Sequence, residues 1–417
     1  MGEERFGRYL QAFEEEPPVS IRLNPRKSLT PNPSPSREGS SEVPQEGWTV
    51  IGGEPVPWCE QGYYLPKRPN FTMDPLLHAG CYYVQEASSM FLEEVVRQTS
   101  PLPKQGGAGG GSEVLDMCAA PGGKSTLLRS MLSEECQLTS NEPIRNRYQV
   151  LEENVLKWGY ANHTVTNLYP RDFVKQKQRF DLILCDVPCS GEGMFRKDPA
   201  TISEWSPKNV ERCWQLQREI VSDAWQCLNP GGLLIYSTCT FNTKENEENV
   251  RWFMEELGAE LLPIETKPEW NITGSLLMGF DAPVYRFIPG ITRGEGLFMC
   301  AMKKKAPPPQ PLPEWRGEKK HRAGISRLQA NSSLPSQGGT GGESVPLSYQ
   351  QAIAYLRGEA LVLPEDTPRG IVNVTFLGHV LGQMKNIGTR ANNLYPKAWR
   401  IKTTHIPNEY EAILRHS

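Results

Sequence analysis

Two cysteines stand just beyond two apolar runs of the sequence, in settings that suit chemistry. The first run leads through Asp186 to Cys189 in DLILCDVPCSGEG, and the second ends at Cys239 in GLLIYSTCTFN. A thiolate is soft and nucleophilic enough at neutral pH to add to an electron-poor ring carbon. Two thiols and a carboxylate that meet in one crevice would therefore offer a nucleophile, a second proton-transfer group and an acid.

The competing interpretation is that these thiols are small buried hydrophobes, as most free cysteines are. We accept that interpretation for Cys185 and Cys227, which fall inside apolar periodicities. The polar residues beside the other two cysteines favour a chemical role for that pair: Ser190, Thr238 and Thr240.

Methylation of carbon 5 of a cytosine needs such a set of groups, because that carbon is a poor nucleophile toward a sulfonium methyl. Addition of a thiolate at carbon 6 breaks the aromaticity and moves electron density onto carbon 5. Asp186 could stabilise this intermediate at ring nitrogen 3, and Cys189 could assist the loss of the carbon-5 proton.

A glycine-rich turn lies in VLDMCAAPGGKSTLL, between a short apolar run and a helical pattern. Gly122 and Gly123 allow a sharp turn and a close approach of the backbone to a ligand. Glu142 follows the next apolar run, where an acidic side chain can accept both hydroxyls of a ribose. Asp172, after the third run, is placed to hold an adenine. The pattern favours a nucleoside cofactor.

These segments have three other possible interpretations. The letters GGKS resemble the end of a phosphate-binding P-loop, but that motif needs a glycine where this chain has Cys118. A purely structural glycine turn stays open, because a short glycine pattern is weakly specific. Structural zinc is disfavoured, since Cys185 and Cys189 form one CxxxC pair without a second pair or a His cluster. We therefore expect no metal.

These motifs need a frame of alternating strands and helices. Strand-like runs occur at 113–117, 137–140, 163–168, 180–186 and 232–237, and helical patterns occur at 124–132, 145–158, 207–228 and 244–257. This alternation predicts an α/β fold, with a doubly wound and mainly parallel sheet between helices on both faces. Ligands bind outside the carboxyl ends of such strands, which is where every motif above falls.

Composition limits the class of protein and its compartment. The 417 residues include no apolar run long enough to span a bilayer, and the start MGEERFGRYL lacks the apolar stretch of a signal peptide. We therefore expect a cytoplasmic protein with reduced thiols. The net charge of −3 gives no overall attraction to a polyanion, so a nucleic-acid binder would need a local basic patch. Three stretches rich in Pro, Gly and Ser are predicted to be disordered, at 31–47, 101–112 and 306–346.

Together these motifs resemble those of the NOP/Sun family of RNA cytosine-5 methyltransferases. The matching segments are DMCAAPGGK, DVPCSGEGMFRKDP and YSTCTFNTKENEENV, with SIRLNP at 20–25, HAGCYYVQEASSM at 78–90 and RFIPGITRGEGLF at 286–298. The last three look like the N-terminal arm, the entry helix and the closing strands of the family. DNA cytosine methyltransferases also have a Pro-Cys motif, but the added Thr-Cys motif is typical of the RNA branch. One departure is Gly290 after Pro289, where many relatives have His.

The resemblance implies a Rossmann-like domain that uses S-adenosylmethionine. It implies that Cys239 attacks carbon 6, that Cys189 assists product release and that Asp186 is a third catalytic residue. The residues that it implies for cofactor binding are Cys118, Ala119, Ala120, Pro121, Gly122, Gly123, Lys124, Glu142, Asp172 and Asp186.

The segment 367–408 carries six Lys or Arg and no Asp or Glu. Basic residues interleaved with aromatic ones suit phosphate contact and base stacking, although a solvated face of a small β domain is the alternative. The segment resembles the PUA-like domain of the bacterial 16S rRNA (cytosine-5) methyltransferase F group, which favours rRNA over tRNA as the substrate. The residues predicted to contact RNA are Lys385, Arg390, Tyr395, Lys397, Trp399 and Arg400.

The expected organisation is an N-terminal RNA-binding region at 1–75, the methyltransferase domain at 76–305, a linker at 306–346 and the PUA-like domain at 347–417. We expect a monomer that binds RNA and S-adenosylmethionine. The alternatives are a tRNA cytosine-5 methyltransferase and a non-catalytic RNA-binding factor in ribosome assembly. A binding-only protein has no use for two thiols in one crevice, which favours the enzyme.

Overall fold

A computed structural model of the chain describes residues 2–27, 47–99, 111–306, 344–403 and 405–416. Almost all of the three predicted insertions lies outside the described residues. One predicted boundary is wrong, because residues assigned to the linker form strand β14 (Ser344–Pro346), which pairs with β15 (Gly370–Phe376).

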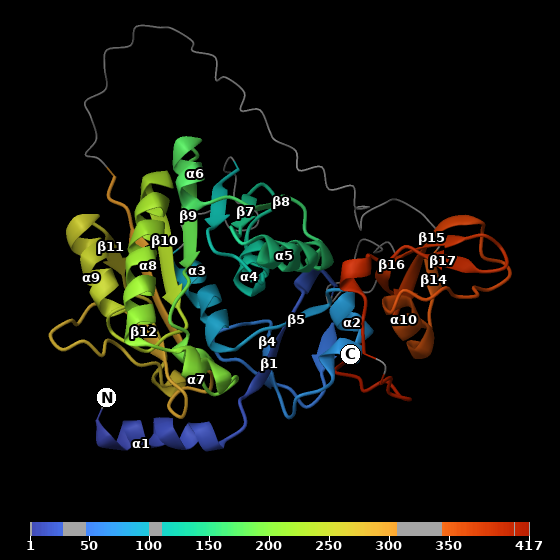
Figure 1. Cartoon of the computed structure of the whole chain (residues 1–417), viewed down its shortest axis with the longest axis horizontal. Coiled ribbons are helices and arrows are strands. Elements are labelled where there is room, and N and C mark those ends of the chain that lie inside the picture. The colour runs from blue at the N-terminus through green and yellow to red at the C-terminus, as the bar shows by residue number, and fades with distance from the viewer. Residues whose placement is uncertain (1, 28–46, 100–110, 307–343, 404, 417) are drawn as a thin grey trace, which may run out of the picture.

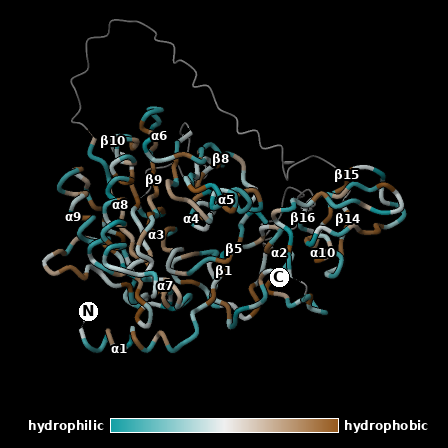
Figure 2. Tube along the Cα trace, in the orientation of Figure 1, coloured by the Kyte–Doolittle hydropathy of each residue, from teal (hydrophilic) through white to brown (hydrophobic). Residues whose placement is uncertain are grey.

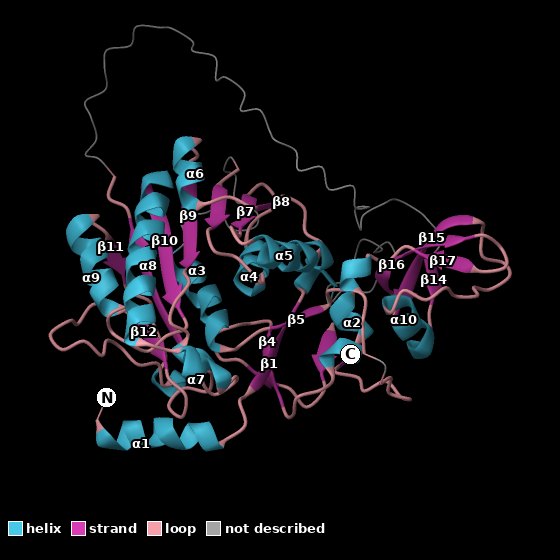
Figure 3. Ribbon diagram, in the orientation of Figure 1, coloured by secondary structure: helices cyan, strands magenta, loops and turns pink. Residues whose placement is uncertain are grey.

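The central sheet has the strand order β11-β13-β10-β9-β6-β7-β8, with β12 on β13 (Figure 3). Five strands run parallel: β6 (Glu113–Asp116), β7 (Gln137–Asn141), β8 (His163–Thr166), β9 (Phe180–Asp186) and β10 (Leu228–Thr238). Three strands add an antiparallel edge: β11 (Glu260–Leu262), β12 (Tyr285–Phe287) and β13 (Leu297–Lys303). The predicted mainly parallel sheet is confirmed.

Helices cover both faces of this sheet because its strands carry apolar side chains on alternate sides. Leu182 and Leu184 of β9 join one buried cluster with α3 (Leu92–Thr99) and α4 (Gly123–Met131). Ile183 and Cys185 join the opposite cluster with α6 (Pro170–Lys175), α8 (Pro207–Cys227) and α9 (Glu247–Glu256). Hydrophilic and hydrophobic residues alternate along the tube of α8 in Figure 2, as an amphipathic helix requires.

Most predicted elements of this domain match the observed ones, including α5 (Arg145–Trp158) at its predicted bounds. Two expectations differ. The entry helix predicted at 78–90 is mostly strand β5 (Tyr82–Val84) and turns, and α3 begins only at Leu92. The β-prone run Tyr-Tyr-Val pairs with strand β1 (Val19–Leu23) instead of coiling. Helix α6 was not predicted, because its six residues are too few to show a periodicity.

Two smaller sheets lie beside the central one, and the N-terminal sheet stands between it and the C-terminal sheet (Figure 1). The N-terminal sheet has the order β3-β4-β1-β5, with β3 (Glu54–Pro55) and β4 (Gly62–Leu65), and the chain also forms helices α1 (Glu3–Gln11), α2 (Pro75–His78) and α7 (Ala200–Glu204). The C-terminal sheet has the order β14-β15-β16-β17, with β16 (His379–Asn386), β17 (Ala391–Asn393) and helix α10 (Tyr349–Leu356) beside it. Strands β18 (Leu414–His416) and β2 (Trp48–Val50) pair across the two regions.

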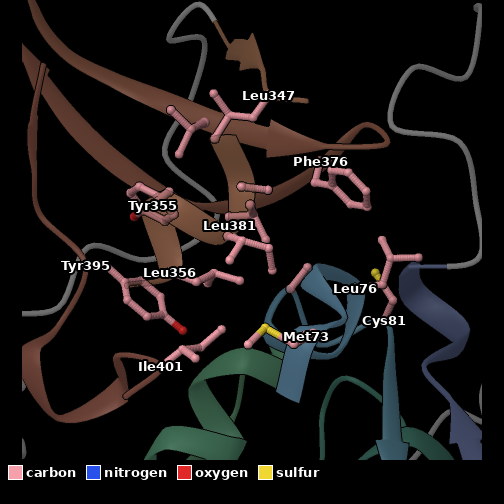
Figure 4. Close-up of a cluster of buried hydrophobic side chains, with 14 of the residues drawn as sticks. Met73, Leu76, Cys81, Leu347, Tyr355, Leu356, Phe376, Leu381, Tyr395 and Ile401 are labelled. Atoms are coloured by element: carbon pink, nitrogen blue, oxygen red, sulfur yellow. The ribbon is translucent and has the colours of Figure 1, made fainter. Parts of the chain in front are cut away.

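One hydrophobic core joins the N-terminal and C-terminal regions. Met73, Leu76 and Cys81 face Leu356 and Leu381 in this cluster (Figure 4). The two regions therefore share buried surface, although more than 250 residues separate Leu76 from Leu347 and later members of the cluster. None of the helices in the described residues is both long and apolar enough to cross a membrane.

Candidate active site

Strands β9 and β10 lie side by side, and their carboxyl ends bring the two predicted cysteines together. Ser237 pairs with Asp186 at the last step of this parallel register. The chain then turns on both strands, and the Sγ atoms of Cys189 and Cys239 lie 3.2 Å apart, 50 residues from each other in sequence. Both thiols are half-buried. The expected convergence of the two strand exits is thus observed.

The two sulfur atoms have different acidities. The hydrogen bond from the Cys189 thiol lowers the pKa of Cys239, and the Lys124 ammonium lowers it further, against opposing effects of burial and Asp186. The same hydrogen bond raises the pKa of Cys189 well above its usual value, and burial and the negative charge of Cys239 add to the rise. Cys239 is therefore the more acidic thiol of the pair, and Cys189 is the thiol that donates to it.

Buried polar bonds hold the two cysteine loops in register. The Glu245 carboxylate accepts from the Ser190 backbone N–H at 3.0 Å, from Gln217 Nε2 at 2.7 Å and from Asn242 Nδ2 at 2.7 Å. The Gly193 N–H donates to the Cys239 carbonyl at 2.7 Å. A Cβ atom at Gly193 would lie 2.5 Å from that carbonyl oxygen, so only glycine fits here. The thiols thus sit on a pre-organised frame, which the sequence did not reveal.

Lys124 and Asp186 connect this frame to the glycine-rich turn. Lys124 Nζ donates to Asp186 Oδ2 at 2.8 Å, and Ser237 Oγ donates to Asp186 Oδ1 at 2.7 Å. Burial lowers the pKa of Lys124, but the Asp186 carboxylate more than offsets this effect, so the pKa is raised overall. Lys124 therefore places a positive charge near Cys239. The sequence prediction had assigned Lys124 only to cofactor binding.

The turn itself runs from β6 into α4 as predicted. Gly122 has a left-handed backbone with φ of 114°, and α4 begins at the next residue. Cys118, Ala119 and Ala120 are buried, and burial raises the pKa of the Cys118 thiol well above its usual value. A residue that the prediction omitted, Asp116, is fully buried at the end of β6, and burial raises its pKa to about 7.

Glu142 directly follows the last residue of β7, and only one of its two carboxylate oxygens accepts a hydrogen bond among the described residues. The residue is 1% exposed, and its Oε1 accepts from the Ile144 N–H at 2.9 Å. Its Oε2 has no hydrogen-bond partner in the described part of the chain, and the Arg147 guanidinium lies 3.5 Å away. A buried acceptor without a donor is costly unless a ligand completes it. The residue fits the predicted role as an acceptor of ribose hydroxyls.

Asp172, which the sequence placed beside an adenine, makes its observed contacts within helix α6. Its carboxylate accepts from the Tyr169 N–H at 3.1 Å and pairs with Lys175, so it caps the first turn of α6. Its side chain is 28% exposed. The acid after the third strand is thus engaged in local helix capping, where a carboxylate is favoured by the helix N-terminus.

The predicted RNA-contact residues of the C-terminal region divide into two groups. Lys385, Arg390 and Lys397 are exposed. Tyr395 is only 3% exposed, and its ring packs against Tyr355 in the shared core, so the ring predicted to stack on a base faces the core and not solvent. Trp399 and Arg400 are half-buried, and Lys157 Nζ lies 5.3 Å from the Trp399 ring centroid. The interleaved aromatics of this segment hold the domain against its neighbours.

Within the described ranges there is no group of three His, Cys, Asp or Glu side chains that could hold a metal. Ten cysteines are free, and eight of them are buried.

Three family models match the chain. The model for 16S rRNA methyltransferase RsmB/F matches residues 109–303, that for the N-terminal domain of 16S rRNA methyltransferase RsmF matches 1–87, and that for the methyltransferase RsmF PUA domain matches 343–401.

Curated relatives agree with these matches. Ribosomal RNA small subunit methyltransferase F of Escherichia coli O9:H4 is 35% identical over 280 residues, which cover 65% of this chain and 55% of the relative. The protein of the same name from Pectobacterium atrosepticum is 33% identical over 276 residues, with 65% and 54% coverage. The chain spans about half the length of the curated relatives it matches.

Solved structures share the fold. A methyltransferase homologue from Pyrococcus horikoshii is 27% identical with a TM-score of 0.56, over 72% of this chain and 91% of that one. NSun6 from Pyrococcus horikoshii, determined with SFG, is 20% identical with a TM-score of 0.53, over 73% and 95%. The chain belongs to the RsmB/F methyltransferase family, with the N-terminal and PUA domains of RsmF around its Rossmann-like methyltransferase domain.

Proposed function

We propose that this protein methylates carbon 5 of a cytosine in 16S rRNA, with S-adenosylmethionine as the methyl donor. The observation that carries the proposal is the 3.2 Å contact between the Cys189 and Cys239 sulfur atoms, beside the Lys124–Asp186 pair. The curated relatives that the chain resembles are named as rRNA small subunit methyltransferases, which supports rRNA as the substrate.

The residues of the glycine-rich turn and of β7 fit S-adenosylmethionine, which supplies an electrophilic sulfonium methyl group when bound. Cys118, Ala119, Ala120, Pro121, Gly122, Gly123 and Lys124 would form the wall of the site. Glu142 Oε2, buried without a hydrogen-bond donor among the described residues, would accept from the ribose. Asp186 would lie between the donor and the cytosine. Asp172 would contribute indirectly, by capping α6.

Cys239 would begin the reaction. Its thiolate forms a bond to carbon 6, the ring loses its aromaticity, and electron density reaches carbon 5. Ring nitrogen 3 then takes up a proton from solvent, and the Asp186 carboxylate accepts a hydrogen bond from that N–H. Lys124 keeps Asp186 in place through its 2.8 Å bond. Carbon 5 is then nucleophilic enough to take the methyl group.

Cys189 would complete the reaction because the first step changes its acidity. Its pKa is raised chiefly by the hydrogen bond to Cys239 and by the charge of that thiolate. Both effects vanish when the Cys239 sulfur is bonded to carbon 6, so Cys189 can release its proton to solvent. It then takes the proton from carbon 5. The electrons of that C–H bond re-form the double bond between carbon 5 and carbon 6, the carbon–sulfur bond breaks, and ring nitrogen 3 returns its proton to solvent. The Cys189 thiol again donates to the Cys239 thiolate.

Single substitutions of the two cysteines separate these roles. Cys189→Ala should accumulate a covalent protein–RNA adduct that survives denaturing electrophoresis, because release is slow. Cys239→Ala should abolish both the adduct and methyl transfer. Cys213→Ala is the matched control, because that thiol is buried in α8 and has no part in the proposed steps. Entry of radiolabelled methyl into RNA with Cys239→Ala would overturn the assignment.

The substrate is tested in cells. Bisulfite sequencing of rRNA and tRNA with and without the protein should show one 16S rRNA cytosine that loses methylation. Loss at a tRNA site would favour a tRNA methyltransferase instead. Unchanged methylation together with defective ribosome assembly would favour a non-catalytic assembly factor.

A further inference from the structure

Arg22 of strand β1 reaches from the N-terminal sheet into the methyltransferase domain. The side chain is 1% exposed, and its guanidinium carbon lies 4.5 Å from the Trp158 ring centroid. Nε donates to Gln85 Oε1 at 2.8 Å, and Nη2 donates to Thr126 Oγ1 at 2.6 Å and to the Gly123 carbonyl at 3.2 Å. About a hundred residues separate Arg22 from these last two partners.

Two of these partners, Gly123 and Thr126, lie in the first turn of α4, which follows the glycine-rich turn directly. Thr126 Oγ1 donates in turn to the Gly122 carbonyl at 2.8 Å. Tyr83, which is the register partner of Arg22 in β5, donates through its hydroxyl to the Pro121 carbonyl at 3.2 Å. Two adjacent side chains of the N-terminal sheet thus bind both sides of Gly122, where the backbone is left-handed.

A charged anchor at this place is not explained by simple packing. A guanidinium gains nothing from the N-terminus of a helix, where the partial charge is already positive, and burying it costs solvation. Burial lowers the pKa of Arg22 to about 10. An apolar side chain could fill the same space, but it could not hold a carbonyl and a hydroxyl in fixed directions. The bonds therefore fix the shape of the turn.

We propose that Arg22 is a positioning residue for the methyl donor, so that the N-terminal sheet sets the affinity of the glycine-rich turn. This rests on the proposed function, because it takes S-adenosylmethionine as the ligand of that turn. Arg22 acts through Gly123 and Thr126 and does not itself contact the reacting atoms.

The test compares two buried arginines that serve opposite ends of α4. Arg22→Met keeps the stem over Trp158 and removes the donors. Arg129→Met is the matched control, because Arg129 is 2% exposed and donates to the Leu132 and Cys136 carbonyls beyond the other end of the helix. Binding of S-adenosylhomocysteine is measured by calorimetry on the full chain, with the melting temperature of each variant.

Arg22→Met should raise the Kd for S-adenosylhomocysteine roughly 10-fold or more, since charged hydrogen bonds are lost. Arg22→Lys should recover part of the affinity. Arg129→Met should lower the melting temperature without changing that Kd. In Arg22→Met, but not in Arg129→Met, the KM for the methyl donor should rise by a larger factor than kcat falls. If Arg22→Met does not fold, Tyr83→Phe and Thr126→Val replace it, each with an expected loss of roughly 3-fold.

A Kd within 2-fold of the wild-type value in a folded Arg22→Met protein, or in both substitutes, would overturn the positioning role. Equal losses of affinity in Arg22→Met and Arg129→Met would overturn it as well, since they would reflect stability alone. A wild-type protein that does not bind S-adenosylhomocysteine would overturn the proposed function, and this inference with it.

Discussion

Lys124 donates to Asp186 at 2.8 Å across 62 residues of sequence, and this bond links the glycine-rich turn to the exit of β9. The other Asp186 oxygen accepts from Ser237, which precedes the β10 exit. A single carboxylate thus ties together three segments: the glycine-rich turn, the end of β9 and the end of β10. Lys124 also favours the Cys239 thiolate by its charge.

Lys124→Met should therefore lower methyl transfer roughly 100-fold at pH 7, through the loss of electrostatic stabilisation. Part of the loss should be recovered at higher pH, because the pKa of Cys239 rises without the ammonium and more thiolate returns as the pH increases. The measurement is kcat/KM from pH 6 to pH 10. A loss that is the same at every pH would show that Lys124 does not act on the thiolate.

The acidity of Cys239 should depend on Cys189. Since the Cys189 thiol is the main cause of the lowered Cys239 pKa, Cys189→Ala should raise that pKa and slow alkylation of Cys239 by iodoacetamide at pH 8. The pH–rate profile of alkylation should move to higher pH, while Cys213→Ala leaves it in place. The covalent RNA adduct of Cys189→Ala should accordingly form slowly and persist.

Glu142 and Asp172, two of the three acids predicted to bind the cofactor, should respond differently to substitution. Glu142→Gln should raise the Kd for S-adenosylhomocysteine roughly 10-fold, because an amide oxygen accepts more weakly than a carboxylate. Asp172→Asn should leave the Kd nearly unchanged and lower stability by about 0.5–1 kcal/mol, through the weakened cap of α6. Calorimetry measures the Kd of both variants, and thermal unfolding measures their stability. A larger loss of affinity in Asp172→Asn would restore the role predicted from the sequence.

The frame of the methyltransferase domain could be predicted because its signals are local. The run Phe180–Asp186 is continuously apolar and buried from Leu182 to Cys185, as a strand covered on both faces must be, and its bounds match. The convergence of Cys189 and Cys239 followed from the rule that parallel strands end at one edge. Those inferences needed only periodicity and topology.

The contacts that complete the site could not be predicted, because they join distant segments through single side chains. Arg22 in SIRLNP gives no sign that it reaches Gly123, and Glu245 gives none that it holds Ser190. Composition alone cannot separate an aromatic residue of a binding surface from one of an interdomain core. Tyr395 therefore entered the RNA-contact prediction although it is buried.

Asp116 should make stability depend on pH. Its folded-state pKa of about 7 lies above the ordinary value of 3.8, so its contribution is fully present below pH 3.8 and is lost as the pH rises through 7. Asp116→Asn should remove that dependence and be more stable than the wild type at pH 8, by up to roughly 4 kcal/mol. Ser125→Ala should steepen the dependence, because the Ser125 hydroxyl lowers the pKa of Asp116. Unfolding in urea at pH 4, 6 and 8 measures both, and a wild-type stability that rises with pH relative to Asp116→Asn would contradict the assignment.

Different residues of the C-terminal domain should affect RNA affinity and protein stability. Lys385 and Arg390 are exposed, so replacing both by Ala should weaken RNA binding and reduce its salt dependence, with the melting temperature nearly unchanged. Tyr395→Ala should instead cost roughly 3 kcal/mol of stability, because its ring packs on Tyr355 and Trp399 in the core.

Tyr395→Phe is the matched control for that comparison, since it keeps the ring and removes only the hydroxyl 3.5 Å from His78 Nδ1. It should bind RNA as the wild type does. Filter binding at several salt concentrations, together with thermal unfolding, tests all three variants. If Tyr395→Phe bound RNA several-fold more weakly at an unchanged melting temperature, the ring would have to leave the core in the complex. The shared cluster of the N-terminal and C-terminal regions would then open when RNA binds.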